Sequence, residues 1–274
     1  MNNKSIWFKS SLLFLLWFCV FIPVYPVLWQ TWMNSSNNSH GLLVPLISVF
    51  LIWTKRDQLS KANLDSSNWG VVILIVSLAL YIVSLAGHVA VIQRAMIVFS
   101  LIGLILFNFG PLVFNISAFP LFYLIFMIPV PVSVYTLVAF PLQLFATNVA
   151  YVLIKVVNIP VFKEGNMLYF VQTQLEVAEA CSGLRSMMAF VMLSVLFAYF
   201  MDRGWWRRGA LILSSIPLAI AVNIVRVTGT GVLAHFYGEK VARGFMHEFS
   251  GLVVFALGFV LMFLEFVLLN KTRR

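Results

Sequence analysis

The stretch from residue 176 to 188 carries the residue types best suited to nucleophilic chemistry in this chain. It contains Cys181 and, four positions later, Arg185. Positions four apart share a helix face, so both side chains would point the same way in a helical segment. A guanidinium and a helix N-terminus both lower the pKa of a nearby thiol, and the thiolate is the stronger nucleophile. The alternative is structural, with Cys181 a small buried hydrophobe and Arg185 an interfacial anchor.

A second candidate is the arginine inside the apolar run of about 209–233. Arg226 lies within this run, and Asn223 precedes it by one helical turn on the same face. A charge inside the bilayer costs several kcal/mol, so such a residue usually faces the bundle interior or a polar cavity. There Arg226 could stabilise an oxyanion or bind a carbonyl or carboxylate of a substrate. The alternative is a structural arginine that pairs with helix carbonyls or with Glu179.

A third candidate, His247, begins the last apolar run of the chain. A neutral imidazole can take a proton from a thiol and return it to a leaving amine. Cys181, Arg226 and His247 together would supply a nucleophile, an anion stabiliser and a base. An ordinary interfacial histidine is the alternative, and no second histidine follows at metalloprotease spacing.

Composition defines the class of the protein. The chain has 274 residues, of which 62% are hydrophobic and only 10% are charged, so it is a polytopic membrane protein. The net charge of +9 is carried by clusters between apolar runs, which indicates orientation signals and not nucleic-acid binding. Cys19 and Cys181 lie in different apolar runs without a CxxC or Cys/His cluster, so we expect no disulfide, metal or organic cofactor.

The apolar runs predict an all-α integral membrane bundle of about eight transmembrane helices. The expected spans are residues 10–29, 41–53, 69–87, 92–109, 112–130, 182–200, 209–233 and 249–269. The turn Asn108–Pro111 separates the fourth span from the fifth. Residues 132–163 could form a span, a re-entrant segment or an interfacial helix. The alternating residues 161–171 predict a short β-hairpin around Gly165.

The basic clusters predict the orientation of the chain. They lie at residues 4–9, 55–61, 203–208 and 271–274. Eight spans with both termini cytoplasmic place all four clusters inside, provided that residues 132–163 do not cross the membrane. Cys181 and His247 would then lie at the outer surface. We expect a single membrane domain over residues 1–274, whose first apolar run is a membrane helix and not a removed signal peptide.

Three segments also resemble a known family. Residues 180–185 (Ala-Cys-Ser-Gly-Leu-Arg), 223–227 (Asn-Ile-Val-Arg-Val) and 247–251 (His-Glu-Phe-Ser-Gly) resemble, in this order, the three motifs of the exosortase/archaeosortase family. Residues 39–41 (Ser-His-Gly) and 53–56 (Trp-Thr-Lys-Arg) resemble its N-terminal part. The resemblance covers the whole length by expected topology.

The resemblance implies a membrane cysteine peptidase or transpeptidase whose fold is unrelated to that of sortases. By position, Cys181 matches the family nucleophile, Arg226 the essential arginine and His247 the third residue. Glu179, Arg185 and Asn223 are expected to support the site or contact substrate. Archaeal members tend to have arginine in the third place, so His247 favours a bacterial exosortase, here without the extra C-terminal domain of some members.

The resemblance also implies the partners and the location. Exported proteins with a C-terminal sorting signal, comprising a motif such as Pro-Glu-Pro (PEP-CTERM), a membrane helix and a basic tail, would be the substrates. Cleavage near the motif would take place on the periplasmic side of the cell inner membrane. The product could pass to water or to a lipid- or sugar-linked acceptor.

Two other classes remain open from the residues alone. A transporter or flippase would use Arg226 as a substrate-binding charge, and a membrane scaffold would use all three residues structurally. Neither class requires Cys181, whereas peptide cleavage does. Substitution of Cys181 by serine or alanine therefore separates them.

Overall fold

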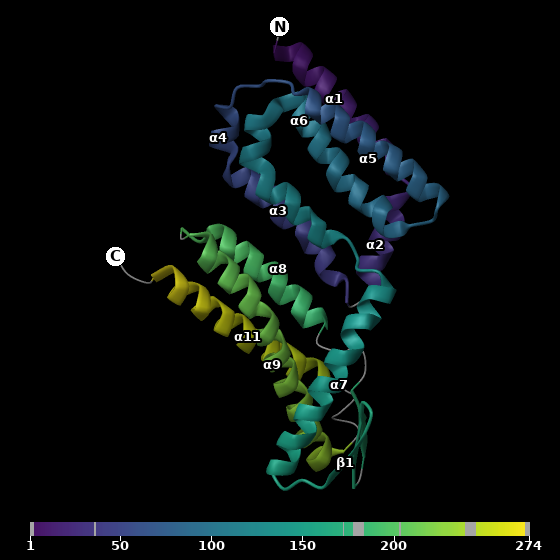
Figure 1. Cartoon of the computed structure of the whole chain (residues 1–274), viewed down its shortest axis with the longest axis vertical. Coiled ribbons are helices and arrows are strands. Elements are labelled where there is room, and N and C mark those ends of the chain that lie inside the picture. The colour runs from purple at the N-terminus through teal and green to yellow at the C-terminus, as the bar shows by residue number, and fades with distance from the viewer. Residues whose placement is uncertain are drawn as a thin grey trace. The chain divides into compact units, whose positions relative to one another are not determined.

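The computed structural model describes residues 3–35, 37–171, 173–177, 184–202, 204–238 and 245–271. Side chains are described throughout these ranges except at 3–7, 184 and 245–250. The chain forms two compact units, Met1–Pro131 and Val132–Arg274 (Figure 1). The expectation of one membrane domain over residues 1–274 stays a prediction.

The first unit contains helices and no strand among its described residues. Its elements are α1 (Asn3–Val20), α2 (Val24–Asn34), η1 (Ser39–Leu42), α3 (Leu43–Thr54), α4 (Arg56–Ser60), α5 (Asn68–Ala86), α6 (Ala90–Tyr123) and η2 (Leu124–Met127). The expected single span at 10–29 is bent by 65° between α1 and α2. Pro23 lies at this break as the N-cap of α2, because proline cannot donate the hydrogen bond that would continue α1.

Helix α6 folds back on itself at Gly110. This glycine has φ 86°, a left-handed conformation that favours glycine, and an added Cβ there would lie 1.7 Å from the carbonyl oxygen of Asp65. The first turns of α6 and η2, which follows the end of α6, both contact α2, at the adjacent residues Thr31 and Trp32. Arg94 Nη2 donates to Thr31 Oγ1 (3.4 Å), and Trp32 Nε1 donates to Met127 O (3.0 Å).

A straight helix would separate Arg94 and Met127 by about 50 Å, so the chain must reverse between them. The reversal confirms the turn that the sequence predicted at Asn108–Pro111.

The first half of α6 packs closely against α5 because two glycines face each other. An added Cβ at Gly70 would lie 2.3 Å from Phe107 N, and one at Gly103 would lie 2.7 Å from Leu74 N. Small residues let membrane helices approach until their backbones touch, which increases dispersion contacts where no hydrophobic effect operates. Close packing of the α5 and α6 backbones therefore stabilises this unit.

The basic clusters of the first unit lie at one end of it. Ser10, next to the cluster at 4–9, donates to Asn108 Oδ1 (3.1 Å), close to the turn at Gly110. Lys55 Nζ donates to Ile116 O (3.2 Å) on the other side of the same turn. Both clusters thus lie at the Gly110 end, as the orientation prediction requires.

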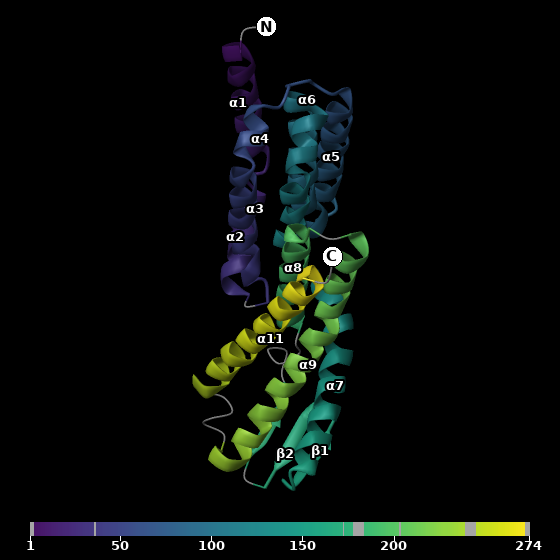
Figure 2. The ribbon, with the colours of Figure 1, turned by 90° about the vertical axis from the view of Figure 1, so that its left-hand side faces the viewer.

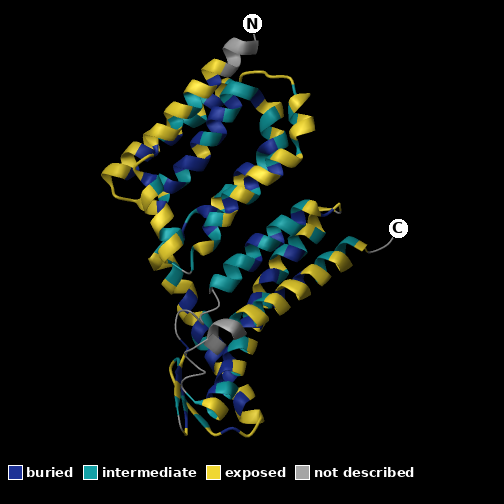
Figure 3. Cartoon of the chain, turned by 180° about the vertical axis from the view of Figure 1, so that it is seen from behind, coloured by how far each residue is buried: buried dark blue, intermediate teal, exposed yellow. Residues whose placement is uncertain are grey.

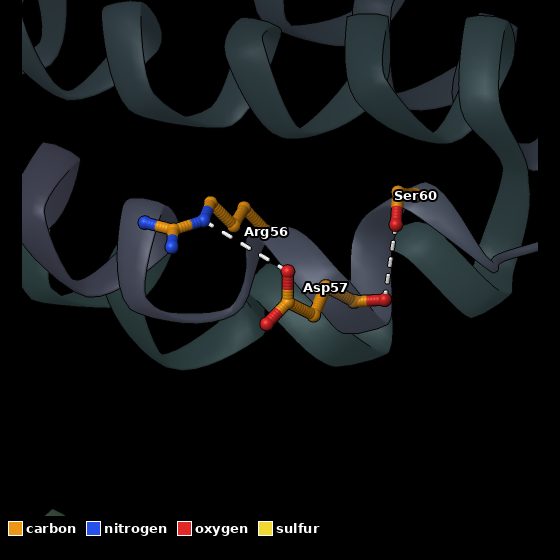
Figure 4. Close-up of polar contacts among 3 residues, drawn as sticks. All are labelled: Arg56, Asp57 and Ser60. Atoms are coloured by element: carbon orange, nitrogen blue, oxygen red, sulfur yellow. Dashed lines mark hydrogen bonds and ion pairs between the residues drawn. The ribbon is translucent and has the colours of Figure 1, made fainter.

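Helix α4 carries the second basic cluster in an exposed position (Figure 4). Arg56 Nε lies 3.8 Å from Asp57 Oδ1, and Ser60 Oγ donates to the Asp57 carbonyl oxygen (3.1 Å). The Arg56 guanidinium also lies 4.6 Å from the ring centroid of Trp53. Tryptophan and arginine together are typical of a membrane–water interface.

Among its described residues, the second unit combines long helices with a small sheet (Figure 2). Its described elements are α7 (Val132–Val156), β1 (Val161–Glu164), β2 (Met167–Phe170), β3 (Gln174–Glu176), α8 (Leu184–Phe200), α9 (Trp205–Tyr237) and α11 (Phe245–Lys271). The strands form an antiparallel sheet of order β1-β2-β3, with Phe162 opposite Tyr169 and Leu168 opposite Leu175. The turn at Gly165, with φ 58°, confirms the predicted hairpin.

Two apolar clusters form the core of this unit. One joins the sheet to α7 and α9 through Leu168, Leu175, Ile154 and Val227, all buried. The other joins α8, α9 and α11 and consists of Phe190, Ala198, Met201, Leu211, Ala219, Val222 and Met262. Helix α9 takes part in both clusters, so it is the central helix of the unit.

Many exposed residues of the helices, which are yellow in Figure 3, have large apolar side chains. On α11, for example, Leu252 and Leu268 are 67% and 65% exposed. Such a surface is stable only in lipid, and the helices satisfy their own backbone groups as a bilayer requires. The all-α polytopic membrane fold is thereby confirmed, with the short sheet as an addition.

Five described helical segments are long and apolar enough to cross a membrane. They are Asn68–Ala86, Ala90–Met127, Val132–Val156, Trp205–Tyr237 and Gly251–Lys271. The bent pair α1–α2 adds a sixth if it forms one span, and Ser39–Thr54 and Arg185–Phe200 are shorter apolar helices. The count of about eight spans is not established by these helices. The segment 132–163, which the sequence left open, begins with one continuous apolar helix, α7.

Candidate active site in the second unit

Helices α8, α9 and α11 lie side by side and meet around Gly258 (Figure 1). An added Cβ at Gly258 would lie 2.4 Å from Phe190 Cζ on α8 and 2.9 Å from Val222 Cγ2 on α9. At the opposite end of this bundle, Arg208 Nη2 donates to Met201 O (2.7 Å). Helices α8 and α9 therefore run antiparallel. The contacts at Gly258 show that Phe190 of α8 and Val222 of α9 lie at nearly the same height along the bundle.

Arg185 and Arg226 lie at nearly the same level of the bundle. Arg185 precedes Phe190 on α8 by about 7 Å along the axis, and Arg226 follows Val222 on α9 by about 6 Å. Because α8 and α9 are antiparallel, the step from Phe190 back to Arg185 and the step from Val222 forward to Arg226 run in the same direction along the bundle. Two cations that are far apart in the sequence thus lie at similar heights along the bundle, and both side chains are half-buried.

Gly251 brings α11 against the Arg226 guanidinium. An added Cβ at Gly251 would lie 3.5 Å from Cζ, Nε and Nη2 of Arg226. His247 lies in the first turns of α11, one turn before Gly251, so the two positions share a helix face. The described backbone therefore places position 247 on the face that Arg226 contacts, although the His247 side chain lies outside the described residues.

Polar residues line one face of α9 around Arg226. Asn223 and Thr230, one turn before and one turn after it, are each only 4% exposed. Burying three polar side chains on one face of an apolar helix is costly unless that face meets polar groups. The prediction that Arg226 faces the interior, with Asn223 on the same side, agrees with this burial.

Cys181 and Glu179 fall outside the described residues, within 178–183. The flanking residues Val177 and Leu184 are described. The described part of α8 begins at Leu184, so a helix face shared by Cys181 and Arg185 stays a prediction.

The candidate site combines three predicted sources of chemistry. The Arg226 guanidinium on α9 lies beside Gly251 of α11, and position 247 lies in the first turns of α11, whereas Cys181 precedes α8 in the sequence. A thiol and an imidazole form a nucleophile–base pair, and a guanidinium stabilises a developing oxyanion. Among the described residues, no group of three or more His, Cys, Asp or Glu side chains could hold a metal ion.

The comparison with known families identifies the family of the chain. Residues 32–264 match the model of the family described as transmembrane exosortase (Exosortase_EpsH). The chain belongs to the transmembrane exosortase family. The matched region contains parts of both units and all six predicted site residues. The exosortase is an integral membrane protein. Neither the curated proteins nor the solved structures contain a significant match.

Three residues near the candidate site were not predicted from the sequence to shape it. Gly251 admits the Arg226 guanidinium, and Gln143 and Asn166 bind the segment that leads to Cys181. For Gln143 a signal was present, because a glutamine inside an apolar helix needs a buried partner. Gly251 lies in the third family motif, but the motif alone does not show that the glycine admits the Arg226 guanidinium.

Proposed function

We propose that this exosortase is a membrane-embedded cysteine peptidase or transpeptidase that removes the C-terminal sorting signal of exported proteins. Cys181 is the nucleophile, His247 the base and Arg226 the stabiliser of the oxyanion. The observation that carries the proposal is the contact of Arg226 with Gly251, because it joins the α9 arginine to the α11 face of His247 beside the start of α8.

The reaction follows from these three groups. His247 takes the proton of the Cys181 thiol, and the thiolate attacks the scissile carbonyl carbon. Arg226 binds the oxyanion of the tetrahedral intermediate, which collapses as the C–N bond breaks and the leaving amine takes the proton from His247. The resulting thioester is released by water, or by the amine of a lipid- or sugar-linked acceptor.

Charge and helix length support an outward-facing site. Arg207 Nη1 donates to Leu269 O (3.2 Å), so the clusters at 203–208 and 271–274 lie at one end of the bundle, which the positive-inside rule places in the cytoplasm. Arg226 is about 28 Å from Arg207 along α9, close to the ~30 Å thickness of the hydrocarbon core. These distances support a site at the periplasmic boundary of a bacterial inner membrane.

A substrate anchored by its own membrane helix suits this location. Its helix spans the same bilayer, its basic tail stays in the cytoplasm, and a PEP-CTERM-like motif just outside the membrane meets the site. Anchoring removes much of the entropic cost of the encounter. Arg185, Glu179 and Asn223 lie near these groups in sequence or in space and are proposed to contact the substrate or support the site.

The test compares the two cysteines in cells that express a tagged substrate. We expect Cys181→Ala to abolish cleavage, with a loss of at least about a thousandfold, because the covalent step needs the thiol. Cys19 lies exposed on α1, so Cys19→Ala should process substrate within about twofold of wild type and serves as the matched control.

Labelling completes this test. A membrane-impermeant maleimide should label Cys181 in intact cells that express the Cys19→Ala variant. Full cleavage by a folded Cys181→Ala protein would instead favour a transporter, flippase or scaffold in which Cys181 is structural.

A further inference from the structure

Gln143 is a buried polar residue in the middle of the apolar helix α7. Only 7% of it is exposed. Its Nε2 donates a hydrogen bond to the carbonyl oxygen of Val177, the last described residue before the Cys181 segment. Burying an amide in an apolar helix is unfavourable unless it is bonded, so this hydrogen bond accounts for the presence of a glutamine at this position.

Val177 is held at both of its backbone polar groups. Its N–H donates to the carbonyl oxygen of Asn166 in the hairpin turn (2.9 Å). Its carbonyl oxygen accepts from Gln143 and also from Asn166 Nδ2 (3.4 Å), which uses both lone pairs. The side chain is 1% exposed within the sheet–helix core. The chain thus leaves the sheet from a point that is pinned to α7 and to the β1–β2 turn.

The distance from this point to the nucleophile is short. Cys181 is four residues beyond Val177 and three before Leu184, so both flanking points are fixed while the thiol lies on a connection of six residues. A slip of one residue at Val177 would move the chain by about 3.3 Å. A misplacement of about 1 Å can cost a hundredfold in rate, so the register at Val177 matters for chemistry.

We propose that Gln143 is a positioning residue that sets the register of the chain entering the Cys181 segment. The inference rests on the proposed function and deepens it. Gln143 does not touch the reacting atoms; it acts through the Val177 carbonyl. The apolar contacts of Leu168, Leu175 and Ile154 hold the sheet on α7 and α9 without it, so its loss should leave the fold in place.

The experiment removes the donor without removing the volume. Gln143→Leu and Gln143→Met are purified as full-length protein and compared with wild type in cleavage of a sorting-signal substrate. We expect kcat to fall about 10- to 100-fold while KM changes less than about threefold, because the thiol is displaced but substrate still binds. Thr147→Val is the control: Thr147 is fully buried one turn further along α7 and donates only to the Gln143 carbonyl oxygen.

A second readout follows the thiol directly. The alkylation rate of Cys181, measured in a Cys19→Ala background, should fall at least severalfold in both Gln143 variants and stay unchanged in Thr147→Val. A thiol moved away from a guanidinium and a helix N-terminus is less ionised and reacts more slowly. A merely structural role would lower the thermal midpoint of unfolding without this change in a folded protein.

Two results would overturn the proposal. One is a kcat and an alkylation rate within twofold of wild type in Gln143→Met, which is similar in size, has no donor and serves if Gln143→Leu does not fold. The other is an equal loss in Thr147→Val. A separate Cys181→Ala protein that cleaves normally would reject the proposed function, and the alkylation rates would still decide whether Gln143 positions the segment.

Discussion

Each unit of the exosortase buries an arginine in an apolar helix, and the two differ in what they contact. Arg94 of the first unit is 9% exposed and donates to Thr31 Oγ1 across a helix–helix contact. Arg226 of the second unit is half-buried and meets α11 at a glycine, one turn from His247. Arg94 therefore ties helices together, whereas Arg226 projects a charge toward a face that carries a candidate base.

The surroundings of the two arginines show the same contrast. In the first unit, polar side chains bond to backbone carbonyls of other segments, as Ser48 does to Pro120 (3.0 Å) and Tyr81 to Val20 (3.2 Å). In the second, Gln143 and Asn166 converge on Val177, on the path to Cys181. An arginine in an apolar helix is therefore a functional candidate because of its neighbours and not because of its burial.

The largest expected difference comes from replacing each arginine. Arg226→Ala should lower kcat/KM about a hundredfold or more at a thermal midpoint close to wild type, because oxyanion stabilisation is lost. Arg94→Met, which keeps the volume, should lower the thermal midpoint by several degrees because the hydrogen bond from Arg94 to Thr31 Oγ1 is lost, while kcat per folded molecule stays near wild type.

Cleavage kinetics and thermal unfolding in detergent measure both effects. Arg226→Lys is the matched control for charge alone, since lysine lacks the planar fork. The comparison fails if Arg226→Ala cleaves normally, or if Arg94→Met loses kcat at unchanged stability.

A smaller difference is expected from enlarging one glycine in each unit. At Gly251, an added Cβ would make an ordinary contact with the guanidinium, so Gly251→Ala should be tolerated, whereas Gly251→Leu should displace Arg226 and lower kcat about tenfold. At Gly70, the Cβ would meet the Phe107 backbone at 2.3 Å, so Gly70→Ala should cost about 1–3 kcal/mol of unfolding free energy and leave kcat unchanged.

Activity assays and denaturant titration on the same preparations separate these two outcomes. A Gly251→Leu protein with full activity would show that the contact between α9 and α11 does not set the position of Arg226.

The smallest expected effect concerns the exposed ion pair of α4. Arg56 and Asp57 are 59% and 86% exposed, and solvent screens such pairs. Asp57→Asn should change the thermal midpoint by less than about 2 °C and leave cleavage unchanged. Thermal unfolding with matched Asp65→Asn as a control measures this. A shift of many degrees would mean that the first unit depends on its surface charges as well as on its helix packing.

Several features of the fold followed from local sequence. The hairpin around Gly165 and the break at Asn108–Pro111 were both predicted, because glycine and proline determine backbone conformation at the positions where they occur. The bend at Pro23 was missed, since the apolar run continues through it and hydrophobicity alone does not report a change of helix direction.

The candidate site also has features that could be predicted from the sequence and features that could not. The motifs of Cys181, Arg226 and His247 could be recognised from residue types and order, and the family match covers all three. Their spatial relation could not, because it depends on how α8, α9 and α11 pack around Gly258 and Gly251. The role of Gln143 was hidden for the same reason: its partner Val177 lies in a strand segment far along the chain.

The sequence by itself determined the membrane class, the basic end of each unit and the family, because these depend on composition and on short runs of neighbouring residues. Only the tertiary structure decided that Arg226 meets the His247 face of α11 through Gly251, and that Gln143 holds the entry to Cys181. The physical reason is that contacts between distant residues are selected by close packing of whole helices, and hydropathy along one helix does not record which side chains of another it will meet.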